Sequence, residues 1–369
     1  MDRQVTILCG AYNGERYLRE QIQSIQRQSF ADWRLLIRDD GSRDRTLTIA
    51  REMAAADERI EVVDDDLGNC GVAQNFGRLL ERALAESSRY FMFADQDDVW
   101  HDDKIALSLH ALQSVEKRQG TQLPILVHTD LSVVDERLQP IHASFMQFQG
   151  LKIAANCPMR QLVVQNVATG CTMMFNRALL ELATPIPGGV PIHDWWLASC
   201  AAAAGAIEFV PQATLNYRQH SQNQVGARGF WRTLGPAARP WRHLASAANS
   251  KHVRTVRQAR LLLERLTERE TPLNDGAQPV LQNFCAAHAP NVSRLSRTLR
   301  VWRSGVRYSS GIKNLLMFYR LLRTSRQSLE EPSPESSGAS AQSPCPALPG
   351  NPLPKGPAVG PYPSWRRSA

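Results

Sequence analysis

Short apolar runs alternate with segments of helical periodicity through the first third of the chain. Five apolar runs predict strands, at residues 4–9, 33–38, 60–63, 90–94 and 125–128. Between them, apolar positions recur every three to four residues and predict helices, at residues 15–28, 44–56, 72–86 and 103–117. Strands that alternate with helices favour a mostly parallel sheet flanked by helices, an α/β fold.

The pattern loosens after this alternation, and then the composition changes. Residues 158–218 mix short apolar runs with helical segments, and from about residue 228 the chain becomes helical and basic. Residues 330–369 are rich in Pro, Ser and Gly and cannot bury enough apolar surface to become ordered. We therefore predict an α/β domain at 1–227, a basic helical extension at 228–329 and a disordered tail at 330–369.

Charge is distributed unevenly between these parts. The net charge of +8 combines 21 basic and 28 acidic residues in 1–227, a balance of −7, with 19 basic and 4 acidic residues in 228–329, a balance of +15. An acidic body followed by a basic segment predicts that the extension meets an anionic partner. The sequence has no helix-turn-helix or zinc-finger spacing, which argues against nucleic acid as that partner.

Cysteine usage and hydropathy indicate the compartment. The seven cysteines are scattered without CxxC spacing, which argues for a reducing environment and against a disulfide framework or a zinc site. The sequence has no run of 18 apolar residues, and its first residues lack the long apolar region of a signal peptide. These features predict a cytoplasmic protein.

Three carboxylates, Asp95, Asp97 and Asp98, follow the apolar run at 90–93. Neighbouring carboxylates repel one another unless a cation neutralises them, and their oxygens suit Mg²⁺ or Mn²⁺. Because ligands bind beyond the carboxyl ends of strands in α/β sheets, one interpretation is a divalent metal that holds a phosphorylated substrate. The other is a solvated turn, since acidic residues such as Asp103 also cap a following helix.

Six segments, in this order along the chain, resemble one known family. They are AYNGERYLREQIQSI, LLIRDDGSRDRT, FADQDDVW, TGCTMMFN, HDWW and YRQHSQN, and they span roughly residues 4–225. The series is similar to family 2 glycosyltransferases, inverting enzymes with a GT-A-type nucleotide-sugar fold, and within them to bacterial rhamnosyltransferase-like enzymes of surface-polysaccharide synthesis. The resemblance implies a UDP- or dTDP-sugar donor, a saccharide or lipid-linked acceptor, and Mg²⁺ or Mn²⁺ as cofactor.

The resemblance also implies roles for individual residues. The nucleotide-sugar would be bound by Ala11, Tyr12, Asn13, Asp39, Asp40, Asn75, Asp95 and Arg218. The metal would be held by Asp97, Asp95 and His220. The acceptor side would be formed by Gly170, Cys171, Trp195 and Trp196. Asp194 would be the base that takes the proton from the attacking hydroxyl.

Most of these residues also have a purely structural interpretation, which the sequence leaves open. Asn13-Gly14 and Asp40-Gly41 are common turn sequences, and Asp44 and Asp194 suit the start of a helix. The paired tryptophans and the cysteine would be packed in the core.

Arginines recur at near-helical spacing in the basic extension. They are Arg294, Arg297, Arg300, Arg303 and Arg307, and leucines and a tryptophan lie between them. Such a segment suits a helix in the interface of an anionic membrane, which would hold the protein peripherally at the inner face of the bacterial membrane. The alternative is a solvated cationic helix packed on the catalytic body.

Two other functions remain open at this stage. A sugar-phosphate nucleotidyltransferase shares the α/β body and the metal, but it normally needs a Gly-rich loop with a basic residue where only Asn13-Gly14 stands. A basic membrane-binding adaptor without enzymatic activity would leave the acidic clusters as plain turns.

Overall fold

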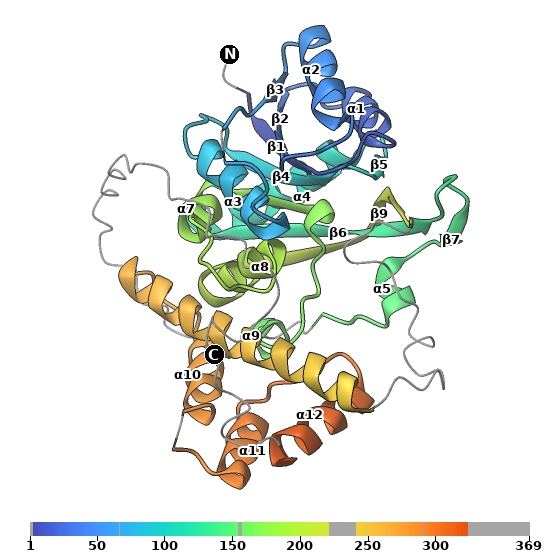
Figure 1. Ribbon diagram of the computed structural model, residues 1–369. Coiled ribbons are helices and arrows are strands. Elements are labelled where there is room, and N and C mark those ends of the chain that lie inside the picture. Colours follow the sequence, from blue (N-terminus) through green and yellow to red (C-terminus); the bar gives the residue numbers. More distant parts are fainter. Residues whose placement is uncertain (1–2, 66, 154–156, 221–240, 290, 324–369) are drawn as a thin grey trace.

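The computed structural model describes most of the chain (Figure 1). The described residues are 3–65, 67–153, 157–220, 241–289 and 291–323, with the backbone alone for 241–251. The tail predicted at 330–369 and the first residues of the predicted extension lie outside the described residues.

A nine-stranded sheet forms the centre of the molecule. Its order is β3 (Ile60–Val62), β2 (Trp33–Asp39), β1 (Val5–Ala11), β4 (Tyr90–Asp95), β8 (Met173–Asn176), β6 (Ile125–Val134), β9 (Ala206–Arg218) and β5 (Val99–Trp100), with β7 (Pro140–His142) on β6. The five predicted strands are confirmed as β1, β2, β3, β4 and β6.

The sheet is parallel in one half and mixed in the other. Strands β3, β2, β1 and β4 pair in parallel, and so do β6 and β9. The short strand β8 runs antiparallel to both β4 and β6, and β5 and β7 pair antiparallel with β9 and β6. The predicted α/β fold is confirmed, with antiparallel strands that the alternation of strands and helices did not predict.

Helices cover both faces of the sheet because side chains alternate along its strands. Ile7 and Cys9 of β1 belong to a core that includes α1 (Leu18–Gln26), α2 (Thr46–Ala56) and α4 (Lys104–Gln119). Leu8, between them, belongs to the opposite core, with α3 (Val72–Ala83), α7 (Arg177–Ala183) and α8 (His193–Ala204). The four predicted helices are confirmed as α1 to α4. The short elements are α5 (Phe145–Gln149), α6 (Met159–Leu162) and the 3₁₀ turn η1 (Gly170–Thr172).

Four helices follow the sheet: α9 (Trp241–Glu268), α10 (Ala277–Ala287), α11 (Arg294–Arg303) and α12 (Gly311–Arg323). Leu262 of α9 and Phe284 of α10 are buried in the same core as Trp196 of α8. Arg265 of α9 donates to the Leu182 carbonyl oxygen at 3.0 Å. The helices therefore continue the core of the α/β body. None of the described helices combines the length and the hydropathy that crossing a bilayer requires.

Candidate active site

Three polar segments meet at one edge of the sheet, where parallel strands end. Ala11 at the end of β1 pairs with Asp39 at the end of β2, and Gly10 pairs with Asp95 at the end of β4. The segments that follow these strands are therefore neighbours in space. The sequence-based expectation that they come together is confirmed.

The segment after β1 is tied to both neighbouring segments through its backbone. The N–H of Tyr12 donates to Gln96 Oε1 at 2.7 Å, and Gln96 Nε2 donates to the Tyr12 carbonyl oxygen at 3.0 Å. The N–H of Asn13 donates to Ser42 Oγ at 2.8 Å, and Asn13 Oδ1 accepts from the N–H of Arg43 at 2.9 Å. Asn13 adopts a positive φ of 49°, which asparagine tolerates well. These bonds fix the segment while the Tyr12 side chain remains 38% exposed.

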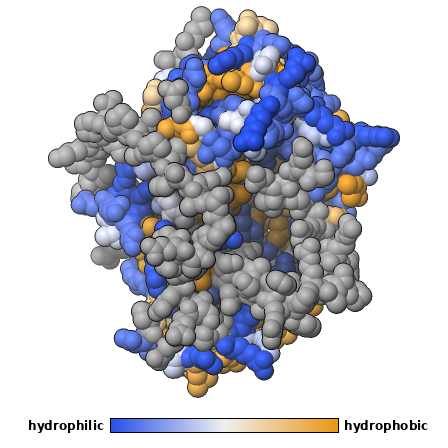
Figure 2. Space-filling model, viewed as in Figure 1, coloured by the Kyte–Doolittle hydropathy of each residue, from blue (hydrophilic) through white to orange (hydrophobic). Residues whose placement is uncertain are grey.

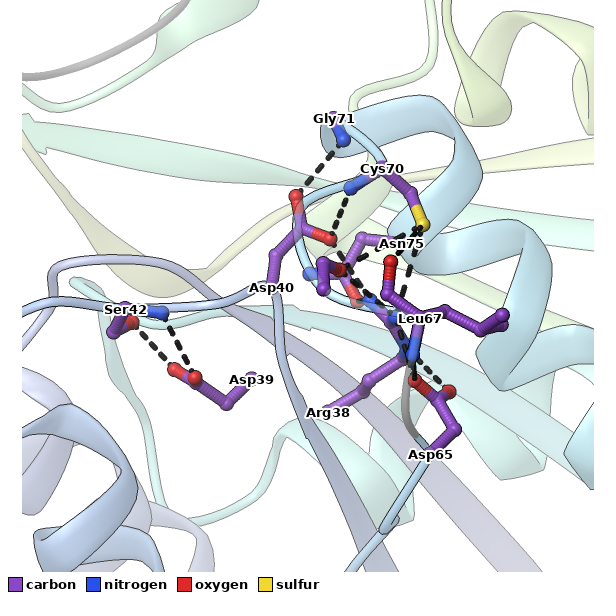
Figure 3. A network of polar contacts seen from close by, with 10 residues as sticks. Arg38, Asp39, Asp40, Ser42, Asp65, Leu67, Cys70, Gly71 and Asn75 are labelled. Carbon is purple, nitrogen blue, oxygen red and sulfur yellow. Dashed lines mark hydrogen bonds and ion pairs between the residues drawn. The ribbon is translucent and has the colours of Figure 1, made fainter. Parts of the chain in front are cut away.

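Asp39 and Asp40 are adjacent in sequence but lie in different environments (Figure 3). Asp39 accepts from the N–H of Ser42 at 2.9 Å and from the Ser42 hydroxyl. Asp40 is buried and accepts from the N–H groups of Cys70 and Gly71 at 2.8 and 2.9 Å. Asp40 thus fastens the loop before α3 to the end of β2.

A buried arginine completes this network. Arg38 donates to Asp40 Oδ1 at 2.8 Å, to both oxygens of Asp65 at 2.7 and 2.8 Å, and to Asn75 Oδ1 at 3.0 Å. Burial opposes the charge, but the bonds to Asp65 and Asp40 raise the pKa of Arg38. Asp40 and Asn75, predicted to bind the nucleotide, therefore support the loop from within. Arg38 and Asp65 were missed, although a charged residue inside a buried apolar strand was a signal.

Asp97 and His220 form a pair across 123 residues of sequence. His220 Nε2 lies 2.7 Å from Asp97 Oδ2, and the His220 ring packs 4.9 Å from the ring of Tyr17, centroid to centroid. Both residues were predicted as metal ligands, and the fold brings them side by side.

A second group of possible ligands lies beside this pair. Asp95, Asp98 and Cys171 hold their donor atoms within 4.8 Å of one another, the one group of three or more such residues in the described part of the chain. Burial, followed by the charges of Asp97 and Asp194, raises the pKa of Asp95 to about 7. Burial and the charges of Asp97 and Asp95 also raise the pKa of Asp98.

Asp194 lies in the first turn of α8 and is 6% exposed. Its Oδ2 accepts from the N–H of Gly170 at 3.0 Å, and its Oδ1 accepts from Asn166 Nδ2 at 3.1 Å and from the N–H of Trp195 at 2.5 Å. Burial raises the pKa of the Asp194 carboxyl to about 7, although the N–H groups of Gly170 and Trp195 oppose this shift. A carboxyl with this pKa can accept a proton near neutral pH. Asn166 was missed, and nothing in its sequence context marked it.

Gly170 packs closely against two side chains of α8. A Cβ atom there would lie 3.1 Å from His193 Nε2 and 3.4 Å from Asp194 Cβ. His193 is itself buried, its ring stacks 3.9 Å from that of Phe76, and its ring nitrogens have no hydrogen-bond partner. Burial lowers the pKa of His193 to about 3, so its ring is neutral.

Trp195 and Trp196, expected on the acceptor side, are packed in the core. Both rings are buried, at 4% and 0% exposure, and their Nε1 atoms donate to the carbonyl oxygens of Leu162 and Ala183 at 2.5 and 2.8 Å. This geometry agrees with the core-packing interpretation that the sequence left open. Cys171 is likewise fully buried, and burial raises the pKa of its thiol, which agrees with a packed residue.

Arg218 is also buried rather than open to a phosphate. Its Nε donates to the Asp97 carbonyl oxygen at 2.9 Å, its Nη1 to the Glu136 carbonyl oxygen at 2.8 Å, and its Nη2 to the Glu20 carboxylate. Its own N–H donates to Asp98 Oδ1 at 3.3 Å. Arg218 therefore positions the turn that carries Asp97 and Asp98, and its predicted contact with the nucleotide-sugar is not what this geometry favours.

A cleft of about 480 Å³ opens beside the paired Asp97 and His220. Its lining residues are Asn13, Glu15, Arg16, Tyr17, Arg43, Asp44, Glu136 and His220. The lining carries both signs of charge, with three carboxylates and two arginines, and Arg16 lies 3.3 Å from the Glu136 carboxylate. Neither arginine was among the predicted site residues.

Comparison with known protein families decides the class of this site. The model of the family "Glycosyl transferase family 2" matches residues 6–181, which include the polar segments after β1, β2 and β4 and the segment before β8. Residues 6–181 form a family 2 glycosyltransferase domain. The predicted family and enzyme class are thereby confirmed, and the nucleotidyltransferase and adaptor alternatives are set aside. The sheet order and the flanking helices agree with the GT-A-type fold predicted for such an enzyme.

Two relatives and one solved structure illustrate what this glycosyltransferase is similar to. The dTDP-rhamnosyl transferase RfbG of Shigella flexneri is 29% identical over 245 residues, which cover 62% of this chain and 79% of that protein. The putative teichuronic acid biosynthesis glycosyltransferase TuaG of Bacillus subtilis is 31% identical over 140 residues, 35% of this chain and 54% of that protein. Among solved structures, the mannosyltransferase PcManGT of Pyrobaculum calidifontis, in complex with GDP-Man and Mn²⁺, has a TM-score of 0.49 at 14% identity and covers 89% of this chain and 85% of that one.

The carboxylates of the glycosyltransferase fit a hard divalent cation. Asp98 Oδ2 is buried without a hydrogen-bond partner. The pKa of Asp95 is raised first by burial and then by the charges of Asp97 and Asp194, which a cation would offset. The Cys171 thiol does not fit, because its raised pKa keeps it neutral and sulfur is a soft ligand. The oxygen donors of Asp95 and Asp97, with His220 beside them, match Mg²⁺ or Mn²⁺ better than they match zinc.

Proposed function

We propose that this glycosyltransferase moves a hexosyl group, with inversion, from a UDP- or dTDP-sugar to a saccharide or lipid-linked acceptor in bacterial surface-polysaccharide synthesis. The observation that carries the proposal is Asp194, a buried carboxyl with a pKa of about 7 that raises the pKa of Asp95 at the strand edge. The similarity to RfbG, a dTDP-rhamnosyl transferase, supports a pyrimidine nucleotide-sugar as donor. We place the reaction in the cytoplasm, at the inner face of the membrane.

The proposed reaction is a single displacement. The acceptor hydroxyl oxygen attacks the anomeric carbon while the Asp194 carboxylate takes its proton. The new carbon–oxygen bond forms as the bond from the anomeric carbon to the diphosphate oxygen breaks, and the electron pair leaves with the nucleoside diphosphate. Because one displacement suffices, no carboxylate has to form a covalent intermediate with the sugar, and the anomeric configuration inverts.

Three contacts hold Asp194 in place for this step. The Gly170 and Trp195 N–H groups and the Asn166 amide each occupy a carboxylate lone pair, so the carboxyl cannot rotate freely. Burial keeps its basicity higher than that of an exposed aspartate. Gly170 packs so closely on Asp194 and His193 that a larger residue there would require one of them to shift.

The opposite half of the site would bind the leaving group. Asp95 and Asp97, supported by His220, would hold Mg²⁺ or Mn²⁺, and the bound ion supplies positive charge to the departing diphosphate. Arg218 holds the turn of Asp97 in position through the Asp97 carbonyl oxygen. The cleft beside the Asp97–His220 pair would accept a phosphate only with a bound cation, because three carboxylates line it beside two arginines.

Asp39 would select the base of the donor. Its carboxylate lies at the end of β2, where it accepts bonds from Ser42, and it could also accept from the imide N–H of uracil or thymine. Ala11, Tyr12 and Asn13 would line the same pocket, fixed by their backbone bonds to Gln96 and Ser42. The loop held by Arg38 and Asp40 would cover it.

The test is a panel of nucleotide-sugars incubated with the protein, Mg²⁺ or Mn²⁺ and a lipid-linked or soluble saccharide acceptor. We expect release of UDP or dTDP, dependent on acceptor and lost with a chelator. Asp39→Asn is expected to raise the KM for the donor, since an amide oxygen is a weaker acceptor than a carboxylate. Release of GDP alone, or of pyrophosphate from a nucleoside triphosphate and a sugar phosphate, would overturn the proposal.

A further inference from the structure

Helices α11 and α12 each carry two apolar faces. On the inner side, Val301 of α11 and Met317 and Leu321 of α12 are buried in the core. On the outer side, Leu295, Leu299 and Trp302 of α11 follow one another at helical spacing and are 64%, 44% and 65% exposed. Helix α12 likewise has exposed apolar side chains at helical spacing, at Ile312, Leu315 and Tyr319, and Leu315 is 73% exposed. We call this outer apolar side the α11–α12 face.

The face concentrates nearly all the exposed apolar side chains of the described protein. Among the described residues, ten large hydrophobic side chains are exposed, and eight of them belong to α11 and α12. The two helices contact each other, and they lie at the end of the molecule opposite β2 and β3 (Figure 1). In Figure 2, drawn from the same side, hydrophobic surface reaches this lower end. Exposed apolar patches of this kind mark interaction surfaces.

The segment that carries the face is uniformly cationic. Residues 291–323 contain eight lysines and arginines and no acidic residue. Arg294 and Arg303 are exposed and flank the apolar residues of α11, and Lys313 and Arg320 do the same on α12. Trp302 and Tyr319, both on the face, have amphipathic rings that favour the boundary between headgroups and hydrocarbon.

We propose that the α11–α12 face docks the protein on an anionic lipid surface, with its apolar side chains among the acyl chains and its arginines at the headgroups. Two copies of this chain that met through the face would bring two cationic rims together, since residues 291–323 contain no acidic residue. Insertion across the bilayer is excluded for α12, because its 13 residues reach only about 20 Å. Membrane binding of this kind is separate from the proposed transfer reaction, and it would bring a lipid-linked acceptor to the enzyme.

The experiment is flotation of the full chain with vesicles of phosphatidylcholine, with and without about 30 mol% phosphatidylglycerol, at about 0.15 M salt. Trp302→Ser combined with Leu315→Ser removes two exposed apolar side chains, and Arg303→Gln combined with Arg307→Gln removes two charges. Ile141→Ser, at the other exposed aliphatic side chain, and Arg51→Gln on α2 are the matched controls. Asp194→Asn separates binding from catalysis.

We expect the unaltered chain, Asp194→Asn and both controls to float with anionic vesicles. Binding of the unaltered chain to neutral vesicles should be at least tenfold weaker, because each arginine or lysine at an anionic surface contributes about 1 kcal/mol. Each double variant should bind anionic vesicles about tenfold less well while its thermal unfolding is unchanged. The proposal is overturned if the unaltered chain stays unbound, if the serine variant binds equally well, or if that variant converts a stable dimer to a monomer. It is also overturned if the serine variant unfolds at a lower temperature, since the face would then be packed against protein.

Discussion

Replacement of Arg38 by methionine tests whether the buried network organises the donor side of the site. Arg38 and Asp40 have side chains only 1% and 3% exposed, so the variant leaves the Asp40 carboxylate buried without its cation. Breaking a buried ion pair on one side costs about 3–5 kcal/mol. Asp40 keeps two N–H donors and Asp65 is 18% exposed. We therefore expect the variant to lose about 3 kcal/mol of its free energy of unfolding, at the lower end of this range.

The free energy of unfolding of Arg38→Met is measured by urea titration followed by circular dichroism. The matched control is Arg19→Met, which breaks an ion pair with Glu52 in which both side chains are 46% exposed, and it should cost under about 1 kcal/mol. The loop that Asp40 fastens should also loosen, and the KM for the donor should rise by about tenfold. A loss of stability no larger than that of the control would refute the account of this network.

Three further outcomes follow from the geometry around Asp194. Gly170→Ala should lower kcat by about 10²-fold, because its Cβ would press on His193 and displace the base, and a kcat within twofold of the unaltered enzyme would speak against this. The transfer rate should rise about tenfold per pH unit up to pH 7 and level off above it, since Asp194 must lose a proton to act, whereas a flat pH profile would contradict its role. Trp195→Phe should reduce stability by about 1–3 kcal/mol by leaving the buried Leu162 carbonyl unpaired, with substrate KM values unchanged; a raised acceptor KM at full stability would restore an acceptor role.

The strands of the parallel half were readable from sequence because each is a buried apolar run. Tyr90 to Ala94 of β4, for example, are all buried. Such an apolar run can be recognised as a strand without knowing which strand it pairs with. The antiparallel strands β5, β7 and β8 are two to four residues long. Strands β5 and β8 pair with residues distant in sequence, and local periodicity carries no signal for that pairing. Strand β7 pairs with the nearby end of β6, but its three residues are too few to show an alternating pattern.

The sequence predicted where the site lies, at the edge of the sheet where parallel strands end, but not which side chains contact one another there. The positions of Asp39, Asp97 and Asp194 follow from the ends of strands and the start of a helix. The structural contacts of Asp40, Arg218 and the tryptophans depend on burial and on partners such as the loop before α3, and their positions in motifs did not predict these contacts. A motif gives the place of a residue, whereas packing decides which of its atoms remain available to a ligand.

The most direct test of the account is the single-turnover rate of sugar transfer by Asp194→Asn, beside Asp103→Asn as control. Asp103 is exposed, precedes α4 and makes no capping hydrogen bond, so its substitution should leave the rate unchanged. Asparagine at position 194 keeps an acceptor for the Gly170 N–H but cannot take a proton, so we predict a rate lower by about 10²–10⁴-fold with donor affinity within twofold. Transfer by Asp194→Asn at a rate within tenfold of the unaltered enzyme would contradict the assignment of Asp194 as the base.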